Sequence, residues 1–227
     1  FNVCINISFC FGFIFMKKKI AILGSTGSIG KSTLDVISKD KKNFDVVLLS
    51  ANNNYKELVQ QAKKFKVKNI IIKNKFFYQK VKKLLKKTKT KVFSGDISIS
   101  SIIFGKIDLT MSAIVGLAGL QPTVDAIKSS KTVALANKET IICAWHILEK
   151  LIKKYKTKIF PVDSEHFSIM ELTKNVANEE VEEIIITASG GPFLDTAINK
   201  LKNIKPKQAI KHPNWKMGKK ISIDSAN

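Results

Sequence analysis

A glycine-rich turn near the amino end constrains more strongly than any other feature how this chain can fold. The apolar run Lys19–Leu23 leads directly into Gly24-Ser25-Thr26-Gly27-Ser28-Ile29-Gly30. A segment with helical spacing follows, and Leu34, Val36 and Ile37 are expected to face inward from it. A strand, a glycine turn and a helix in this order aim backbone N–H groups and a helix amino terminus at a phosphate. The turn therefore predicts a nucleotide-binding site at the start of an α/β domain.

Two classes of phosphate-binding loop compete for this turn. A Walker loop has the pattern G-x-x-x-x-G-K-[ST], and Gly30-Lys31-Ser32 supplies its end, but the required first glycine falls on Ser25. The spacing G-x-x-G-x-x-G instead resembles a dinucleotide fingerprint whose middle glycine is moved by one position, a variant of some NADP-dependent enzymes. We favour the dinucleotide site and keep a P-loop-like phosphate-binding NTPase as the alternative.

The turn after the next apolar run, Val46–Ser50, bears on which dinucleotide would bind. In NAD-binding domains an acidic residue near the end of this strand holds the ribose 2′-hydroxyl. Here the chain continues Ala51-Asn52-Asn53-Asn54, with Lys56 close by and no acid to repel a 2′-phosphate. The turn therefore favours NADP over NAD, although a plain polar loop has the same composition.

Apolar runs and helical patterns alternate along the chain. The predicted helices are Tyr55–Phe65, Phe76–Leu85 and Leu120–Lys128, and the predicted strands are Asn69–Ile72, Ile107–Ala113 and Thr132–Ala136, with a later strand at Ile184–Ala188. Alternation of this length predicts an α/β fold with a doubly wound, mostly parallel sheet. Ligands of such sheets collect beyond the carboxyl ends of the strands.

Two carboxylates lie one residue apart in Pro161-Val162-Asp163-Ser164-Glu165-His166, just after the apolar stretch Lys158-Ile159-Phe160. If a strand continues through them, Asp163 and Glu165 project to the same side and converge on one point. Convergent carboxylates suit a hard divalent cation such as Mg²⁺ or Mn²⁺. A solvated acidic turn is the simpler explanation of an isolated pair, so the neighbouring motifs decide.

Three further segments carry residue types that suit a site. Asn137-Lys138-Glu139 follows the strand Thr132–Ala136 and fits either a ligand site or a plain helix start with Asn137 as N-cap. Ser189-Gly190-Gly191-Pro192-Phe193 is a turn that can present a hydroxyl and free amides to an anion, or is simply a turn. His212-Pro213-Asn214-Trp215-Lys216-Met217-Gly218 places His, Trp and Met in one loop, which favours a lid over a ligand.

The strong positive charge raises the question of nucleic acid or an anionic membrane, since the formal net charge is +21. All 39 basic residues are lysine, whereas arginine is the residue suited to bidentate contacts with phosphate and guanine. An AT-rich coding sequence produces this abundance of Lys, Asn and Ile, and the lysines spread over predicted helix faces. We therefore expect no nucleic-acid partner and no membrane partner, with a lysine-rich nucleic-acid-binding protein as a second alternative.

Residues 1–15 form an apolar leader without an initiating methionine or a positive amino-terminal region. The leader is shorter than the ~20 residues that span a bilayer. Met16, followed by three lysines, has the character of a true start, so we expect residues 1–15 to be upstream sequence rather than an export or organelle-targeting segment. Only Cys143 lies in the body of the chain, which fits a reducing compartment such as the bacterial cytoplasm.

Several motifs occur together and in order, and they give a resemblance that no single motif carries. They are Gly24–Gly30, Ala136–Glu139, Pro161–His166, Ser189–Phe193, His212–Gly218 and Lys220–Ala226. From Lys17 to Ala226 the chain resembles the 1-deoxy-D-xylulose 5-phosphate reductoisomerases, the NADPH- and metal-dependent enzymes of the non-mevalonate isoprenoid pathway. The resemblance implies a Rossmann-like NADPH-binding domain over residues 16–162. It also implies the start of an α+β catalytic domain with a flap loop over residues 163–227.

The resemblance also implies roles for the matching residues. Cofactor binding falls to Thr26, Gly27, Ser28, Ile29, Asn54, Asn137, Glu139 and Gly218. The implied metal ligands are Asp163 and Glu165, and the implied catalytic residues are these two with Lys138 and His212. The implied substrate contacts are Lys138, Ser164, Glu165, Ser189, His212 and Ser225, and Trp215 lies on the implied flap. The implied cofactors are NADPH and a divalent metal, Mg²⁺, Mn²⁺ or Co²⁺.

Two departures from the family pattern stand out. The family has glycine and a basic residue where this chain has Asn52 and Asn53, so cofactor contacts at these positions are not carried over. The family also continues past Asp224-Ser225-Ala226 to a third metal ligand, whereas this chain ends at Asn227. We therefore expect a fragment without turnover of its own. For the full-length protein we expect a cytoplasmic homodimer that converts 1-deoxy-D-xylulose 5-phosphate to 2-C-methyl-D-erythritol 4-phosphate.

Overall fold

A computed structural model describes residues 16–186, 190–214 and 222–223. The chain divides into two compact units, Phe1–Asp163 and Ser164–Asn227. The predicted leader, residues 1–15, lies outside the described residues, and the roles assigned to the two sequence-predicted domains stay predictions. Within the described ranges, none of the helices has both the length and the apolar character that a bilayer span requires.

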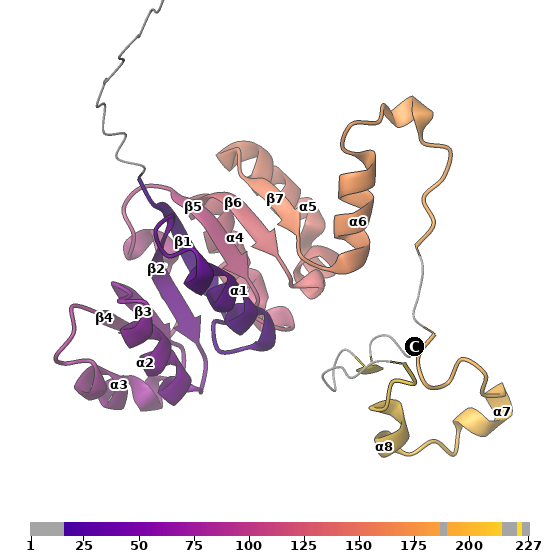
Figure 1. Cartoon of the computed structure of the whole chain (residues 1–227), viewed down its shortest axis with the longest axis horizontal. Coiled ribbons are helices and arrows are strands. Elements are labelled where there is room, and N and C mark those ends of the chain that lie inside the picture. Colours follow the sequence, from indigo (N-terminus) through magenta and orange to yellow (C-terminus); the bar gives the residue numbers. More distant parts are fainter. Residues whose placement is uncertain (1–15, 187–189, 215–221, 224–227) are drawn as a thin grey trace, which may run out of the picture. The chain divides into compact units, whose positions relative to one another are not determined.

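The first unit alternates strands and helices along its whole length (Figure 1). Its strands are β1 (Lys18–Leu23), β2 (Phe44–Ala51), β3 (Asn69–Ile72), β4 (Lys91–Ser94), β5 (Ile107–Ser112), β6 (Ser130–Leu135) and β7 (Lys158–Pro161). Its α-helices are α1 (Ser28–Lys39), α2 (Tyr55–Lys64), α3 (Tyr78–Leu84), α4 (Leu120–Ser129) and α5 (Lys138–Tyr155). Short 3₁₀ turns are η1 (Lys75–Phe77), η2 (Ile99–Ser101) and η3 (Leu117–Gly119).

The seven strands form one sheet in the order β4-β3-β2-β1-β5-β6-β7, and every neighbouring pair is parallel. The order runs outward from β1 in one direction up to β4 and in the other direction from β5 to β7. The strand order therefore reverses between β1 and β5. This position is the topological switch point, where α/β sheets bind ligands. The predicted α/β class and doubly wound sheet are confirmed.

Apolar side chains cover both faces of this sheet, as expected when helices pack on each side. In β1, Ile20 and Ile22 join a core with α1, α2 and α3, while Ala21 and Leu23 join a second core with α4 and α5. This alternation follows from the two-residue period of a strand. A register shift between Ile20 and Ala21 inserts Val47 as an extra residue in β2.

The inward position predicted for Val36 is wrong. Leu34 and Ile37 are buried, but the Val36 side chain is 64% exposed. Positions three apart share a helix face, whereas a residue two positions from Leu34 lies on the opposite side of the helix. The Val36 side chain therefore remains in solvent.

Two elements of the β3–β4 region differ from the sequence-based expectation. The sequence does not predict strand β4 (Lys91–Ser94), because a lysine-rich stretch precedes its only two apolar residues, Val92 and Phe93, and a serine and a glycine follow them. The helix predicted over Phe76–Leu85 begins instead as the 3₁₀ turn η1 and continues as α3. The Asn74 side chain caps this turn by accepting a hydrogen bond from the Phe76 N–H at 3.0 Å.

In its described residues the second unit contains helical segments but no strand. They are α6 (Ser164–Thr173), η4 (Asn178–Glu180), α7 (Ile198–Leu201) and α8 (Pro206–Ala209). The strand predicted at Ile184–Ala188 is wrong over residues 184–186, which have no regular structure, and residues 187–188 lie outside the described ranges. No strand of the described chain pairs with residues 184–186, and an unpaired strand is not stable in water.

Candidate functional site

The glycine turn joins the end of β1 to the start of α1 and is fastened to the end of β2. The N–H groups of Gly24 and Ser25 both donate to the Ser50 carbonyl oxygen, at 3.1 and 2.9 Å. Helix α1 begins at Ser28 with Gly27 as its N-cap, and glycine has no side chain that could satisfy the first-turn N–H groups. The turn therefore presents free backbone donors and the positive end of a helix dipole to an anion.

Packing requires two of the three glycines in this turn. A Cβ atom on Gly24, whose φ is +81°, would lie 2.8 Å from the carbonyl oxygen of Ala113, the residue that follows β5. A Cβ atom on Gly30 would lie 2.5 Å from the Gly24 carbonyl oxygen. For Gly27 the nearest such atom is 3.4 Å away. The turn thus fits tightly against the ends of β1 and β5, while Gly27 has room.

A cavity of about 480 Å³ lies at the switch point, and we name it the switch-point cavity. Its walls are drawn from the stretches 23–27, 50–52, 71–73, 95–99 and 113–115, together with Ala118, Gln121, Pro122 and Asp125. The five stretches lie at the carboxyl ends of β1 to β5 in turn. A volume of this size is typical of small-molecule sites. Of the predicted cofactor residues, Thr26 and Gly27 line this cavity.

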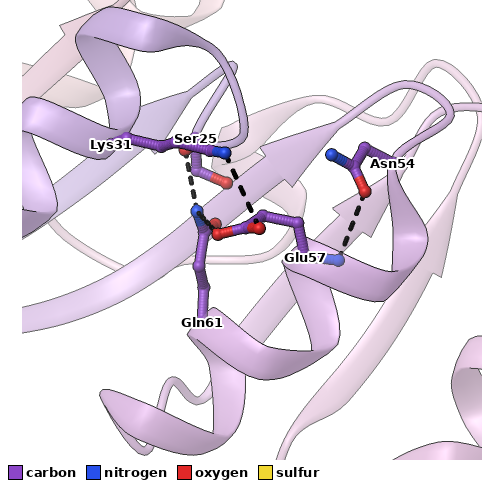
Figure 2. Close-up of polar contacts among 5 residues, drawn as sticks. All are labelled: Ser25, Lys31, Asn54, Glu57 and Gln61. Carbon is purple, nitrogen blue, oxygen red and sulfur yellow. Dashed lines mark hydrogen bonds and ion pairs between the residues drawn. The ribbon is translucent and has the colours of Figure 1, made fainter.

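Helix α2 packs its polar side chains against the glycine turn (Figure 2). Gln61 donates from Nε2 to the Ser25 carbonyl oxygen at 3.0 Å, and Lys31 Nζ lies 3.7 Å from Glu57 Oε2. Asn54 caps α2 by accepting a hydrogen bond from the Glu57 N–H at 3.3 Å. Lys31 therefore pairs with a carboxylate of α2 and does not line the switch-point cavity, which gives no support to the NTPase alternative.

Asn137 connects the end of β6 to the segment after β5. Its side-chain oxygen accepts from the Thr140 N–H at 3.0 Å and so caps α5. Its amide Nδ2 donates to the carbonyl oxygens of Ile114 and Gly116, the latter at 2.9 Å. The residue is 2% exposed, and a Cβ atom on Gly119 would collide with it. The N-cap interpretation of Asn137 is confirmed, and its cofactor role stays a prediction.

The other two residues of this motif begin helix α5. Lys138 is exposed and Glu139 is half-buried. Because α5 follows β6, both residues lie at the carboxyl edge of the sheet, where α/β folds place their functional groups. The contacts that would give Lys138 a catalytic role and Glu139 a cofactor role stay predictions.

The acidic run after β7 is not a continuation of that strand. Strand β7 ends at Pro161, and Glu165 lies in the first turn of α6, which begins at Ser164. The expectation that strand alternation points Asp163 and Glu165 the same way is therefore wrong. The Ser164 hydroxyl donates to Glu165 Oε2 at 3.0 Å, and both residues are exposed.

The remaining predicted residues lie in the second unit. His212 is half-buried, and its Nδ1 accepts a hydrogen bond from the Asn214 N–H at 3.2 Å. Ser189, Trp215, Gly218 and Ser225 lie outside the described residues. Within the described part of the chain, no three His, Cys, Asp or Glu side chains gather where they could hold a metal ion.

Sequence reasoning missed the charged residues Lys73, Asp96 and Asp125 of the switch-point cavity, and with them the amide of Gln121. Gln121 donates from Nε2 to Asp125 Oδ1 at 3.1 Å, and burial raises the pKa of the Asp125 carboxyl group above its usual range. Lys73 directly follows β3, so the rule that ligands collect at strand ends could have found it. Asp96 follows the unpredicted β4 and could not have been found in that way.

Known proteins with similar sequences and structures cover nearly the whole chain. A 1-deoxy-D-xylulose 5-phosphate reductoisomerase from Pelagibacter ubique is 54% identical over 211 residues, which are 92% of this chain and 54% of that protein. The same enzyme from Wolbachia pipientis of Culex pipiens is 46% identical over 210 residues, which are 92% of this chain and 54% of that protein. The chain thus spans about half the length of the relatives it matches.

Solved structures of the same kind have the same fold. The Zymomonas mobilis enzyme in complex with NADPH has a TM-score of 0.83 at 39% identity, with 92% of this chain and 54% of that one covered. A reductoisomerase in complex with NADPH, fosmidomycin and magnesium has a TM-score of 0.81 at 35% identity, with the same coverage.

Two family models match consecutive parts of the chain. The model for 1-deoxy-D-xylulose 5-phosphate reductoisomerase matches residues 20–145, more than half of the chain, and the model for the C-terminal domain of the same enzyme matches residues 159–227. The sequence motifs, the doubly wound sheet and both models agree. The chain belongs to the 1-deoxy-D-xylulose 5-phosphate reductoisomerase family.

Proposed function

We propose that this chain forms the NADPH-binding part and a share of the metal site of a reductoisomerase. The proposed reaction converts 1-deoxy-D-xylulose 5-phosphate to 2-C-methyl-D-erythritol 4-phosphate with NADPH and a divalent metal. The single observation that carries the proposal is the switch-point cavity, which has Gly24, Thr26 and Gly27 of the glycine turn on its wall. Membership of the family supplies the substrate and the reaction.

The residues around the switch-point cavity fit a dinucleotide. Free N–H groups at the start of α1 suit a pyrophosphate, and no Cβ atom can be added at Gly24 without a collision. Ile71, Ile97 and Ile99 give the cavity apolar walls that suit an adenine ring. The turn after β2 has asparagines in place of the acid that would repel a 2′-phosphate.

Asp163 and Glu165 fit a hard divalent cation by the chemistry of their donors, since carboxylate oxygens are what Mg²⁺ and Mn²⁺ prefer. These two residues would hold the metal together with a ligand from elsewhere in the protein. The described part of the chain contains no group of three His, Cys, Asp or Glu side chains that could hold a metal ion. This is compatible with a metal site whose remaining ligand comes from elsewhere in the full-length protein.

The bound metal would supply Lewis-acid charge while the carbon skeleton rearranges, and NADPH would supply the hydride for the reduction. Lys138 would add positive charge beside the reacting oxygens, and Ser164 would orient the substrate next to Glu165. Ser189 and Ser225 would bind the substrate phosphate, His212 would contact the substrate, and the flap at Trp215 would exclude water. Remote phosphate binding would then help to hold the reacting end in place.

The state of the full-length protein is also part of the proposal. We expect the full-length protein to be a homodimer and to lie in the bacterial cytoplasm. We expect its metal site to accept Mg²⁺ or Mn²⁺. The partner is a small sugar phosphate, and we expect neither a nucleic-acid nor a membrane partner. The lysine-rich composition supports no other function, because the lysines are dispersed and no arginine accompanies them.

The test is turnover by the full-length protein. NADPH oxidation is followed after addition of 1-deoxy-D-xylulose 5-phosphate and Mg²⁺, and the product is identified by NMR. Glu165→Gln is expected to abolish turnover while NADPH binding, measured by titration, stays at the wild-type value. Glu171→Gln removes the same charge from the same helix and is expected to leave both measurements unchanged. NADPH oxidation that survives chelation of divalent metals would contradict the proposal.

A further inference from the structure

One lysine of the switch-point cavity stands directly beside the turn that follows β2. The backbone N–H of Lys73 donates to the Ala51 carbonyl oxygen at 2.9 Å, and that of Asn74 donates to the Asn52 carbonyl oxygen at 3.3 Å. The residues after β3 are thereby held against the turn after β2. In this class of sheet the turn after β2 is where the adenosine ribose is recognised.

The turn after β2 carries polar side chains but no carboxylate. The turn supplies Asn52 and Asn53, and Asn74 Nδ2 donates to Asn53 Oδ1 at 2.8 Å. Within the described part of the chain, Lys73 is the only cationic residue that lines the switch-point cavity. A dianionic group bound beside the turn would therefore find amide donors and one positive charge.

Lys73 is positioned but still accessible. Its Nζ donates to Asp96 Oδ1 at 2.5 Å, and its side chain is 48% exposed. An ammonium group has three N–H donors, so a bond to Asp96 leaves two of them for a ligand. Asp96 follows β4, which is the strand on the side of β3 away from β2.

We propose that Lys73 binds the 2′-phosphate of the adenosine ribose and thereby sets the preference for NADPH over NADH. The proposal rests on the proposed function, which places a dinucleotide in this cavity. Lys56, which lies close to the turn in the sequence, is the other candidate for this charge. Lys56 is an exposed residue in the first turn of α2 and does not line the cavity.

Binding titrations of NADPH and NADH with wild type and Lys73→Met test the proposal without any turnover. Loss of a charge-assisted bond to phosphate predicts about 10- to 100-fold weaker NADPH binding and unchanged NADH binding. Adenosine 2′,5′-bisphosphate and adenosine 5′-monophosphate, used as displacing ligands, should show the same contrast, because they differ only in the 2′-phosphate. The wild-type preference should also shrink as salt is added, since salt screens exposed charges.

Two matched variants complete the experiment. Lys68→Met removes the same charge just before β3, at the opposite end of that strand, and should not change the ratio of NADPH to NADH affinity. Lys56→Met should leave the ratio within a factor of about two, an effect below 0.5 kcal/mol. If Lys73→Met leaves the ratio unchanged, or if Lys56→Met removes the preference instead, the assignment of Lys73 is wrong while the dinucleotide site stands. If wild type binds neither dinucleotide, the proposed function itself fails.

Discussion

The two units of this chain differ in how they use apolar residues. In the first unit the runs of β1, β2 and β3 are buried on both faces by helices, as in Leu48 and Ile70, which are both 0% exposed. In the described part of the second unit no large apolar side chain is buried, and Ile184, Ile185 and Ile186 are 56, 71 and 66% exposed. An apolar run thus becomes a strand only where the same chain supplies its neighbours.

The largest test of this contrast is the same substitution made in each unit. Ile70→Ala should lower the free energy of unfolding by about 2–4 kcal/mol, because it removes buried methyl groups and leaves a cavity. Ile185→Ala, at a side chain in solvent, should change it by less than about 0.5 kcal/mol. Denaturant unfolding followed by circular dichroism measures both. Equal costs would show that Ile185 is buried in solution and would remove the contrast.

A second test asks whether the tight packing of the first unit extends to its site. Gly30→Ala should cost about 1–3 kcal/mol, because the new Cβ atom meets backbone atoms that cannot move aside freely. Gly27→Ala is the matched control and should cost less, since its Cβ atom would be 3.4 Å from the nearest atom. Thermal unfolding of both variants compares them. A larger loss at Gly27 would contradict the geometry of the turn.

A third test concerns a carboxylate that joins three central strands of the first unit. Asp108 accepts hydrogen bonds from the Lys19 N–H and from Lys131 Nζ, both at 2.8 Å, and the bond to Lys131 is the main cause of its lowered pKa. A lowered pKa stabilises the fold above the unfolded-state pKa, and this contribution is lost as the pH falls through the folded-state pKa. Asp108→Asn should therefore cost about 1 kcal/mol at neutral pH and almost nothing in strong acid.

Denaturant unfolding across this pH range measures the difference between wild type and Asp108→Asn. Asp195→Asn changes the same charge at an exposed residue of the second unit and should have little effect at either pH. A cost for Asp108→Asn that persists unchanged below the lowered pKa would show that packing, rather than charge, is responsible.

The smallest expected effect has the opposite sign and lies in the switch-point cavity. Burial raises the pKa of Asp125, so the folded state binds a proton more tightly than the unfolded state does. Stability is then lost as the pH rises from the unfolded-state pKa through the folded-state pKa. Asp125→Asn should raise the free energy of unfolding at neutral pH by on the order of 0.5 kcal/mol. The gain should vanish below the unfolded-state pKa, and a loss at neutral pH would refute this account.

Sequence reasoning predicted the first unit well because its signals are local. The glycine spacing of residues 24–30 and the β-branched run Asn69–Ile72 each determine an element without distant contacts. Asn137 caps α5 through a hydrogen bond from Thr140, only three residues further along the chain. The 3.6-residue period of a helix is enough to place Val36 opposite Leu34, so that position could have been predicted from the sequence. Strand β4 is different, because it forms by pairing with β3, and local periodicity does not contain that contact.

The candidate site was predictable only in part for the same reason. Thr26 and Gly27 belong to a motif that can be read along the chain, whereas Lys73 reaches the cavity from the end of β3, and Gln121 and Asp125 reach it from α4. The acidic run was identified by residue type, but its backbone is a helix start rather than a strand. Residue chemistry thus identified the candidate site residues, and only the fold shows which of them line the same cavity.

The switch-point cavity takes its walls from the ends of five strands, and this gives the cavity a mechanical role. Strands β3 and β4 are four residues long, and β4 forms an edge of the sheet. A ligand that touches the ends of both the central and the outer strands links the edge to the centre. Ligand binding therefore raises the free energy of local opening at β4 by mass action. Bound cofactor would then stabilise the sheet edge reversibly, and slower amide hydrogen exchange in β4 would report its binding.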